Sequence, residues 1–212
     1  HLDNIESLDP TFNTIDFDKD IERISVSNGA ELLKVENHIN DIFSLTIEYK
    51  VGEAEIPLLI YASQAVKYCG AGDLSLDDLK NEFAKIGTTF NSWSTRTSTY
   101  IDIKGDEENL NRTLELIGLL IDKPTLEQSK LKTIIDSDLA SRKVERSEPD
   151  AVADALYNYG LYEEKSSYLD RLSSKELKKL QASEVIDALK KATTYNVQIR
   201  FTGKTSANDV SN

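Results

Sequence analysis

The sequence predicts an α+β fold, with a mostly antiparallel sheet covered on one face by helices. Two observations support it: segments with strand periodicity occur as neighbouring pairs, and segments with helical periodicity follow one another in groups. Parallel α/β folds instead alternate strands with helices. In a chain of 212 residues, 39% hydrophobic and 29% charged residues are ordinary for a globular protein. We expect a single domain over residues 21–204, a linker arm at 1–20 and a linker tail at 205–212.

Three strands are expected at the start of the domain. Residues 21–27 and 31–36 are separated by Asn28-Gly29, a dipeptide that supplies the positive φ angles of a tight hairpin turn. From Phe43 to Val51, apolar residues at odd positions alternate with polar residues at even positions. A period of two is typical of a strand with one buried face.

Two helices and two more strands follow. Glycines at positions 70 and 72 end the first helix. Ser75 is a suitable N-cap for the second, because its hydroxyl group accepts a hydrogen bond from a free backbone N–H of the first turn. The expected segments are helices at 53–68 and 75–86, then strands at 89–95 and 98–105.

The second half of the chain is predominantly helical. Apolar residues recur there at intervals of three and four, the spacing of one helix face: Leu110, Leu114, Ile117 and Ile121 in one segment, and Val152, Leu156 and Tyr159 in a later one. The expected segments are helices at 107–122, at 125–146 and from 149 onward, short helices at 174–180 and 183–192, and a last strand at 195–201.

The charge of the chain argues against two classes of partner. A net charge of -12 disfavours nucleic acid and anionic membrane surfaces, because both are negatively charged. The longest apolar run, around Ile56–Ala62, is far shorter than the ~18 residues of a membrane-spanning helix, so no membrane insertion is expected. The single cysteine is compatible with reducing and oxidising compartments, so the location stays open, a periplasmic or other extracytoplasmic one included.

No catalytic or metal-binding constellation can be assembled from the residues alone. His38 has no second histidine one helical turn away and is interpreted as a solvated turn residue. Cys69 has no histidine near it in the sequence and is interpreted as a small apolar residue at a helix end. The Gly-x-Ser-x-Gly and phosphate-loop patterns are absent. Asp136 and Asp138 are interpreted as solvated helix positions.

Several short segments nevertheless occur in an informative order. A strand ends in Val51-Gly52, a helix follows, and a second helix ends in Lys85-Ile86-Gly87-Thr88-Thr89-Phe90-Asn91. The two-helix stretch 107–146, then Asn158-Tyr159-Gly160-Leu161-Tyr162, and a final Thr202-Gly203 complete the series. This series resembles the insulinase–pitrilysin family of zinc peptidases, the inverzincins, over nearly all of residues 21–204. The resemblance implies a domain like the mitochondrial-processing-peptidase-like metallohydrolases.

The resemblance also implies that the zinc motif of this family, His-x-x-Glu-His, has been lost. Alignment with the family places its first histidine at Ser63, its glutamate at Val66 and its second histidine at Lys67. In the motif two histidines on one helix face bind zinc while the glutamate activates a water. A hydroxyl, an isopropyl and an ammonium group cannot do this. The family's third ligand, a glutamate in the long helix, has Asp136 and Asp138 as its nearest counterparts.

A non-catalytic domain of a larger zinc metallopeptidase is therefore implied. Such a domain has no cofactor of its own, and zinc is expected in a catalytic domain or partner subunit that carries His-x-x-Glu-His. Family domains of about this length enclose a chamber, so this one would form part of its wall and help to bind the peptide substrate. The chain alone would not be an enzyme, and its arms fit a domain taken from a longer chain. The alternative is a related structural, scaffold or binding domain with no proteolytic role.

Asn91, Ser92 and Trp93 are the candidate peptide contacts. The resemblance implies this role, because the matching strand of a catalytic domain pairs with extended substrate, a form of β-augmentation. The polar residues of 89–95 also make this strand unsuitable for burial on both faces. In the other interpretation, Trp93 packs against a neighbouring domain or within the core.

Overall fold

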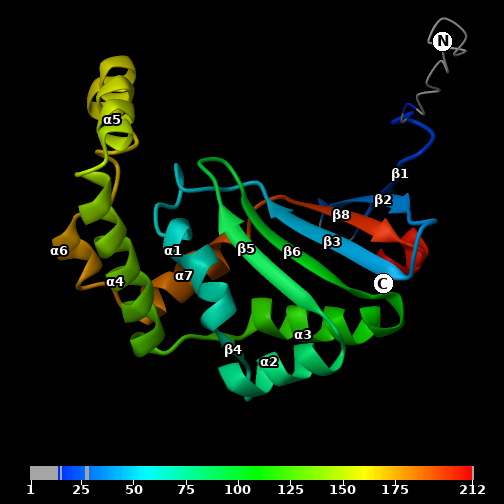
Figure 1. The fold of residues 1–212 in the computed structure, drawn as a ribbon. Helices are drawn as coiled ribbons and strands as arrows, with labels where there is room; N and C mark the ends of the chain where they lie inside the picture. The colour runs from blue at the N-terminus through cyan, green and yellow to red at the C-terminus, as the bar shows by residue number, and fades with distance from the viewer. Residues whose placement is uncertain (1–13, 15, 27–28, 212) are drawn as a thin grey trace, which may run out of the picture.

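The main sheet has six strands, and helices lie against one of its faces and beyond one end (Figure 1). The computed structural model describes residues 14, 16–26 and 29–211. Strand pairs come first and helices are grouped, so the predicted α+β fold with a mostly antiparallel sheet is confirmed. The arm expected at 1–20 falls largely outside the described residues.

The described elements follow the predicted order. The strands of the main sheet are β1 (Glu22–Ser25), β2 (Glu31–Glu36), β3 (Ile42–Tyr49), β5 (Thr89–Ser94), β6 (Thr99–Asp106) and β8 (Val197–Gly203). The helices are α1 (Leu59–Ala65), α2 (Leu76–Lys85), α3 (Leu110–Asp122), α4 (Gln128–Glu145), α5 (Pro149–Tyr162), α6 (Ser174–Leu177), α7 (Ala182–Ala192) and α8 (Ala207–Ser211). Short 3₁₀ helices occur at η2 (Val66–Tyr68), η3 (Glu107–Asn109) and η4 (Glu163–Lys165). A small second sheet pairs β4 (Gly70–Ala71) with β7 (Pro124–Thr125).

The strand order of the main sheet is β1-β2-β8-β3-β6-β5. The last strand, β8, lies between β2 and β3, parallel to the first and antiparallel to the second. The other pairs are antiparallel, including the predicted β1–β2 hairpin. Asn28 of its turn lies outside the described residues, and Gly29 has the positive φ of 78° that favours glycine. Strand β5 occupies one edge.

The core lies between the sheet and the helices. On the inner face, Leu45 on β3 is opposite Phe201 on β8 and Ile103 on β6, and all three are buried. The rings of Phe43 and Phe201 stack with their centroids 6.2 Å apart. The helices add buried aliphatic side chains, which include Leu59, Leu79, Leu116, Leu120, Leu131 and Val185. Removal of this apolar surface from water stabilises the fold.

Two predicted helices begin later in the chain than expected. The helix expected from Glu53 begins at Leu59, because the backbone at 52–54 is instead fixed to the β5–β6 turn: Glu53 N–H donates to Thr95 O at 2.9 Å. The helix expected to be capped by Thr125 begins at Gln128, since Thr125 pairs with Gly70 in the small sheet. The predicted Ser75 cap is confirmed by its hydrogen bond from Asp78 N at 3.2 Å.

The tail also differs from the linker expected at 205–212. Residues Ala207–Ser211 form α8, in which Ala207 is buried and Val210 packs against the core. The small and polar residues of this segment give no apolar pattern of helical period, so the sequence does not predict the helix. The packed domain therefore extends beyond Lys204.

Helix α5 projects from the far end of α4, away from the sheet (Figure 1). The predicted stripe of Val152, Leu156 and Tyr159 is present on it, but none of the residues of α5 is buried. An apolar stripe normally predicts a face packed on the core. Here it marks an unpaired surface.

Candidate functional site

The three positions matched to the zinc motif do not form an open face. Ser63 is 2% exposed in α1, whereas Val66 and Lys67 lie in the following 3₁₀ helix, η2. Val66 is 1% exposed, and Lys67 points to solvent with its ammonium 5.3 Å from the ring centroid of Tyr68. Ser63 and Val66 are therefore both buried while Lys67 is exposed, and the α-helix gives way to a 3₁₀ turn at Val66.

The α4 aspartates behave differently from each other. Asp136 is exposed and paired with Lys132, as expected for a solvated helix position. Asp138 is not solvated in this way: its carboxylate accepts a hydrogen bond of 2.9 Å from the Tyr61 hydroxyl and pairs with Arg142 at 2.9 Å. Burial, reinforced by the hydrogen bond to Asp138, raises the pKa of Tyr61 well above its ordinary value. The sequence analysis does not predict this cluster. The spacing of Asp138 and Arg142, four residues apart on a helix, does indicate their ion pair.

A cavity of about 520 Å³ opens beside this cluster. Its charged lining residues are Glu53, Arg96, Asp138, Arg142, Glu145, Asp170 and Arg171. Most of them are paired: the distance is 2.7 Å between Arg171 and Glu145, and 3.8 Å between Arg96 and Asp170. Positive and negative side chains therefore offset one another in the cavity, and neither sign of charge dominates its lining.

The cavity is connected to the edge strand and to the motif position. Glu53 at its rim accepts a hydrogen bond of 2.6 Å from Ser94, the last residue of β5. The Ser94 oxygen lies 3.4 Å from that of Ser63. The structure thus brings together Ser63, the end of the edge strand and the polar cavity.

Strand β5 divides the three candidate peptide contacts between its two faces. Asn91 and Trp93 lie on the open face of the sheet, and Trp93 is 36% exposed. The indole stacks on Tyr100 of β6, with the ring centroids 5.2 Å apart. Ser92 faces the helices, and its buried hydroxyl finds no hydrogen-bond partner among the described residues. Trp93 is therefore not a core residue of this chain, and Ser92 cannot contact a peptide laid on the open face.

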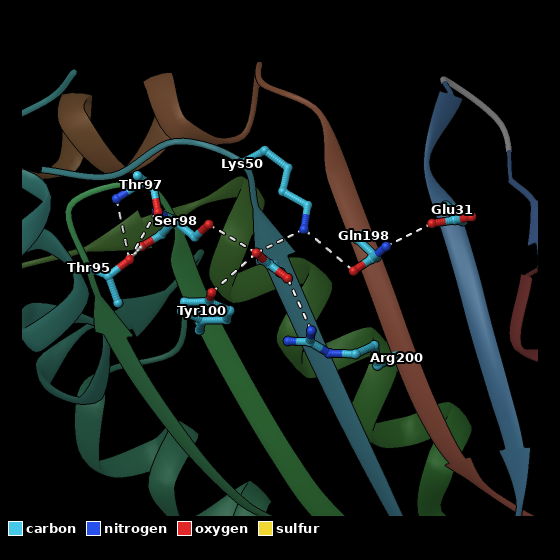
Figure 2. A network of polar contacts seen from close by, with 9 residues as sticks. Glu31, Lys50, Thr95, Thr97, Ser98, Tyr100, Gln198 and Arg200 are labelled. Carbon is cyan, nitrogen blue, oxygen red and sulfur yellow. Dashed lines mark hydrogen bonds and ion pairs between the residues drawn. The ribbon is translucent and has the colours of Figure 1, made fainter. Parts of the chain in front are cut away.

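The open face of the sheet also holds a buried carboxylate that the sequence does not predict. Glu48, expected to be a polar residue on the solvated side of β3, is 5% exposed. Its oxygens accept hydrogen bonds from Ser98 at 2.9 Å and from Tyr100 at 3.2 Å, and form ion pairs with Lys50 and Arg200 (Figure 2). Burial alone would raise the pKa of Glu48, but the hydrogen bonds from Lys50 and Ser98 outweigh it, so the pKa is below its ordinary value.

This network extends across the sheet from the edge strand. Trp93, Tyr100, Glu48, Gln198 and Glu31 occupy successive register positions on five strands. Gln198 donates a hydrogen bond of 2.7 Å to Glu31, as Figure 2 shows. The open face of the sheet is thus a pre-organised polar surface that starts at an exposed tryptophan.

The residues at the motif positions do not fit zinc. Zinc sites in proteins use thiolate, imidazole and carboxylate ligands, and Ser63, Val66 and Lys67 offer none. His38 is an exposed turn residue near Glu36, and Cys69 is buried with its thiol donating to Ala65 O. Within the described ranges, no group of three or more His, Cys, Asp and Glu side chains is arranged to hold a metal ion. Nor does any described helix combine the length and apolarity that a membrane span requires.

Comparison with known proteins shows which class of protein shares this fold. No family model and no curated protein matches the chain. An inactive domain of a peptidase M16 from Pseudomonas fluorescens has a similar structure, with a TM-score of 0.76 and 17% identity over 90% of this chain and 48% of that one. The periplasmic protease PqqL from Escherichia coli gives a TM-score of 0.77 and 16% identity over 98% of this chain and 26% of its own.

A third similar structure is the ferredoxin protease FusC in complex with Arabidopsis ferredoxin, with a TM-score of 0.77 and 16% identity over 91% of this chain and 22% of that one. The chain thus spans less than half the length of each of these structures. It has the fold of a peptidase domain. More specifically, its fold is that of M16 peptidase domains, so the resemblance to the insulinase–pitrilysin family is confirmed at the level of the fold.

Proposed function

We propose that this chain is a non-catalytic domain of a larger zinc metallopeptidase. In this proposal it forms part of the wall of a substrate chamber and binds extended peptide along β5. The zinc site lies in a catalytic domain or subunit that carries His-x-x-Glu-His. The observation that carries the proposal is the combination of an M16 domain fold with Ser63, Val66 and Lys67 at the motif positions.

The open edge supports the peptide-binding part of the proposal. No strand of the described chain pairs with the outer side of β5, so its backbone groups there are available to an added strand. Trp93 stands beside that edge on the open face and offers a large amphipathic ring to an alternate side chain of the peptide. Two of the similar structures are consistent with this role: one is an inactive domain of a peptidase, and the other is a protease in complex with a protein.

The test measures the binding of a cleavage-resistant extended peptide to the chain. Trp93 is the only tryptophan in the sequence, so its fluorescence reports on β5 directly. We expect the emission to shift to shorter wavelength as peptide binds. Trp93→Ala should weaken binding of a labelled peptide, measured by anisotropy, by about ten-fold. Phe17→Ala, which removes an exposed aromatic ring outside the site, should leave it unchanged.

A matched peptide separates backbone pairing from side-chain contact. N-methylation at alternate residues removes the N–H donors that β-augmentation needs while it keeps the side chains. If neither N-methylation nor Trp93→Ala changes the affinity, the peptide-binding role is wrong, and the scaffold alternative is the one that remains. Reading the rest of the coding sequence for His-x-x-Glu-His tests the catalytic partner separately.

A further inference from the structure

Helix α5 exposes more apolar surface than a free-standing helix can usually sustain. The side chains of its apolar stripe are exposed by 41% at Val152, 67% at Leu156 and 52% at Tyr159. Isolated helices of fewer than about 12–15 residues are marginal in water, and helices in proteins are stabilised mainly by packing of an apolar face. The α5 helix has 14 residues, and none of them is buried. Its stability therefore calls for a partner.

The apolar stripe of α5 forms one wall of a groove. The opposite wall is the 166–174 segment, in which Leu169 is 58% exposed. The groove has a volume of about 660 Å³ and is lined by Val152, Leu156 and Tyr159 on one side and by Leu169 and Leu172 on the other. A groove with such walls suits the apolar face of a helix, which places anchors one turn apart.

The charged rim of this groove has the opposite sign to the chain. Three arginines and one glutamate line it, a net of +2, in a chain whose net charge is -12. Arg142 and Arg171 are already paired, with Asp138 and Glu145 respectively. Arg146 is exposed, and the neighbouring acid that it attracts, Glu145, is already engaged by Arg171, so Arg146 is the cation available to a ligand. Charge complementarity then selects a carboxylate beside the apolar face.

We propose that this groove docks an amphipathic helix of a partner protein, with aliphatic anchors on one face and acidic residues beside them. Leu156 and Tyr159 supply the apolar contact, and Arg146 selects the acidic flank. The site is distinct from strand β5 and from the peptide-binding role proposed above, so each can fail without the other.

Two synthetic helical peptides test the proposal. Both carry the same leucine face, and they differ only in flanking residues, glutamate in one and lysine in the other. Binding to the full chain is measured by fluorescence anisotropy at roughly physiological salt, where long-range attraction is screened. The net charge of -12 alone favours the lysine peptide, whereas the groove favours the glutamate peptide. The sign of the preference therefore distinguishes the groove from non-specific attraction.

We expect the glutamate peptide to bind more tightly. Leu156→Asp should weaken it by about ten-fold or more, and Arg146→Glu should reverse the preference between the two peptides. Ile39→Asp, at a site 90% exposed on a distant turn, makes the same kind of change and should have no effect. Circular dichroism checks that each variant is folded.

Three results would overturn the proposal. One is a preference of the wild-type chain for the lysine peptide. Another is equal affinity of Leu156→Asp and the wild type for the glutamate peptide. The third comes from sedimentation: a wild-type dimer that Leu156→Asp dissociates would assign the groove to a second copy of this chain.

Discussion

The hydroxyl of Tyr61 on α1 donates a hydrogen bond of 2.9 Å to Asp138 on α4, a residue 77 positions further along the chain. Arg142 completes the cluster, with ion pairing to Asp138 and a 2.7 Å hydrogen bond to the carbonyl of Leu172. The cluster thus fastens together the motif helix, the long helix and the segment that precedes α6. Asp138, one of the two aspartates that the family resemblance places nearest to a third zinc ligand, is thus a structural residue of this fold.

Loss of this aspartate should destabilise the fold. Arg142 is only 16% exposed in its side chain, so Asp138→Ala leaves a largely buried guanidinium without its carboxylate. We expect the free energy of unfolding to fall by about 3 kcal/mol, measured by urea denaturation. Asp136→Ala removes an exposed carboxylate from the same helix and should change it by less than about 0.5 kcal/mol. Equal effects of the two substitutions would contradict the structural role of Asp138.

Rebuilding the zinc motif should not rebuild a zinc site. Ser63→His and Val66→Glu place larger groups at positions that are 2% and 1% exposed, and Lys67→His lies on a different side of the 3₁₀ turn. We expect the triple variant to be less stable than the wild type by about 3 kcal/mol or more, because overpacking and a buried carboxylate both oppose folding. Metal analysis by mass spectrometry should find no stoichiometric zinc in it. One tightly bound zinc per chain would contradict this geometry.

The sequence predicts the fold well because its signals are local. The alternation along β3 and the Ser75 cap of α2 depend only on neighbouring residues, and the structure confirms both. The position of β8 between β2 and β3 is a long-range outcome that no local period encodes. Helix boundaries at Leu59 and Gln128 were misjudged for the same reason, since contacts distant in sequence decide where each helix begins.

The candidate site was less accessible to sequence reasoning. Glu48 occupies a polar position in an alternating strand, and such positions are normally exposed. Here Arg200 from β8 and Ser98 from the β5–β6 turn enclose its carboxylate. Tyr61 and Asp138 meet only after the chain has folded. For α5 the sequence predicts the apolar stripe correctly. Only the structure shows that no described residue buries this stripe.

The Glu48 network should stabilise the domain in a pH-dependent manner. The pKa of Glu48 is below its ordinary value of 4.5, so its contribution is fully present above pH 4.5 and is lost as pH falls through the lowered pKa. Glu48→Gln should lower the free energy of unfolding near neutral pH by about 2 kcal/mol, because Lys50 and Arg200 lose their shared anion. The substitution should also reduce the fall in the free energy of unfolding that the wild type shows below pH 4.5. An unchanged acid limb in urea titrations would show that other carboxylates control it.

The alkaline limb of stability should depend on Cys69. Burial raises the pKa of its thiol from an ordinary value of 9.0 to about 12. The folded state therefore keeps a proton that the unfolded state releases, so this contribution is complete below pH 9.0 and is lost as pH rises towards about 12. Between about pH 9 and about pH 10 the linkage amounts to a loss of about 1 kcal/mol.

Cys69→Ala removes this titration without introducing a polar group. We expect the variant to be somewhat less stable than the wild type near neutral pH, by about 1 kcal/mol, because a small cavity replaces the sulfur. Its stability should then fall less steeply between about pH 9 and about pH 10 than that of the wild type. Burial also raises the pKa of Tyr49, from 10.0 to about 12, so both proteins should lose stability at higher pH. Parallel curves for variant and wild type from pH 9 to 10 would show that the Cys69 thiol does not set the onset.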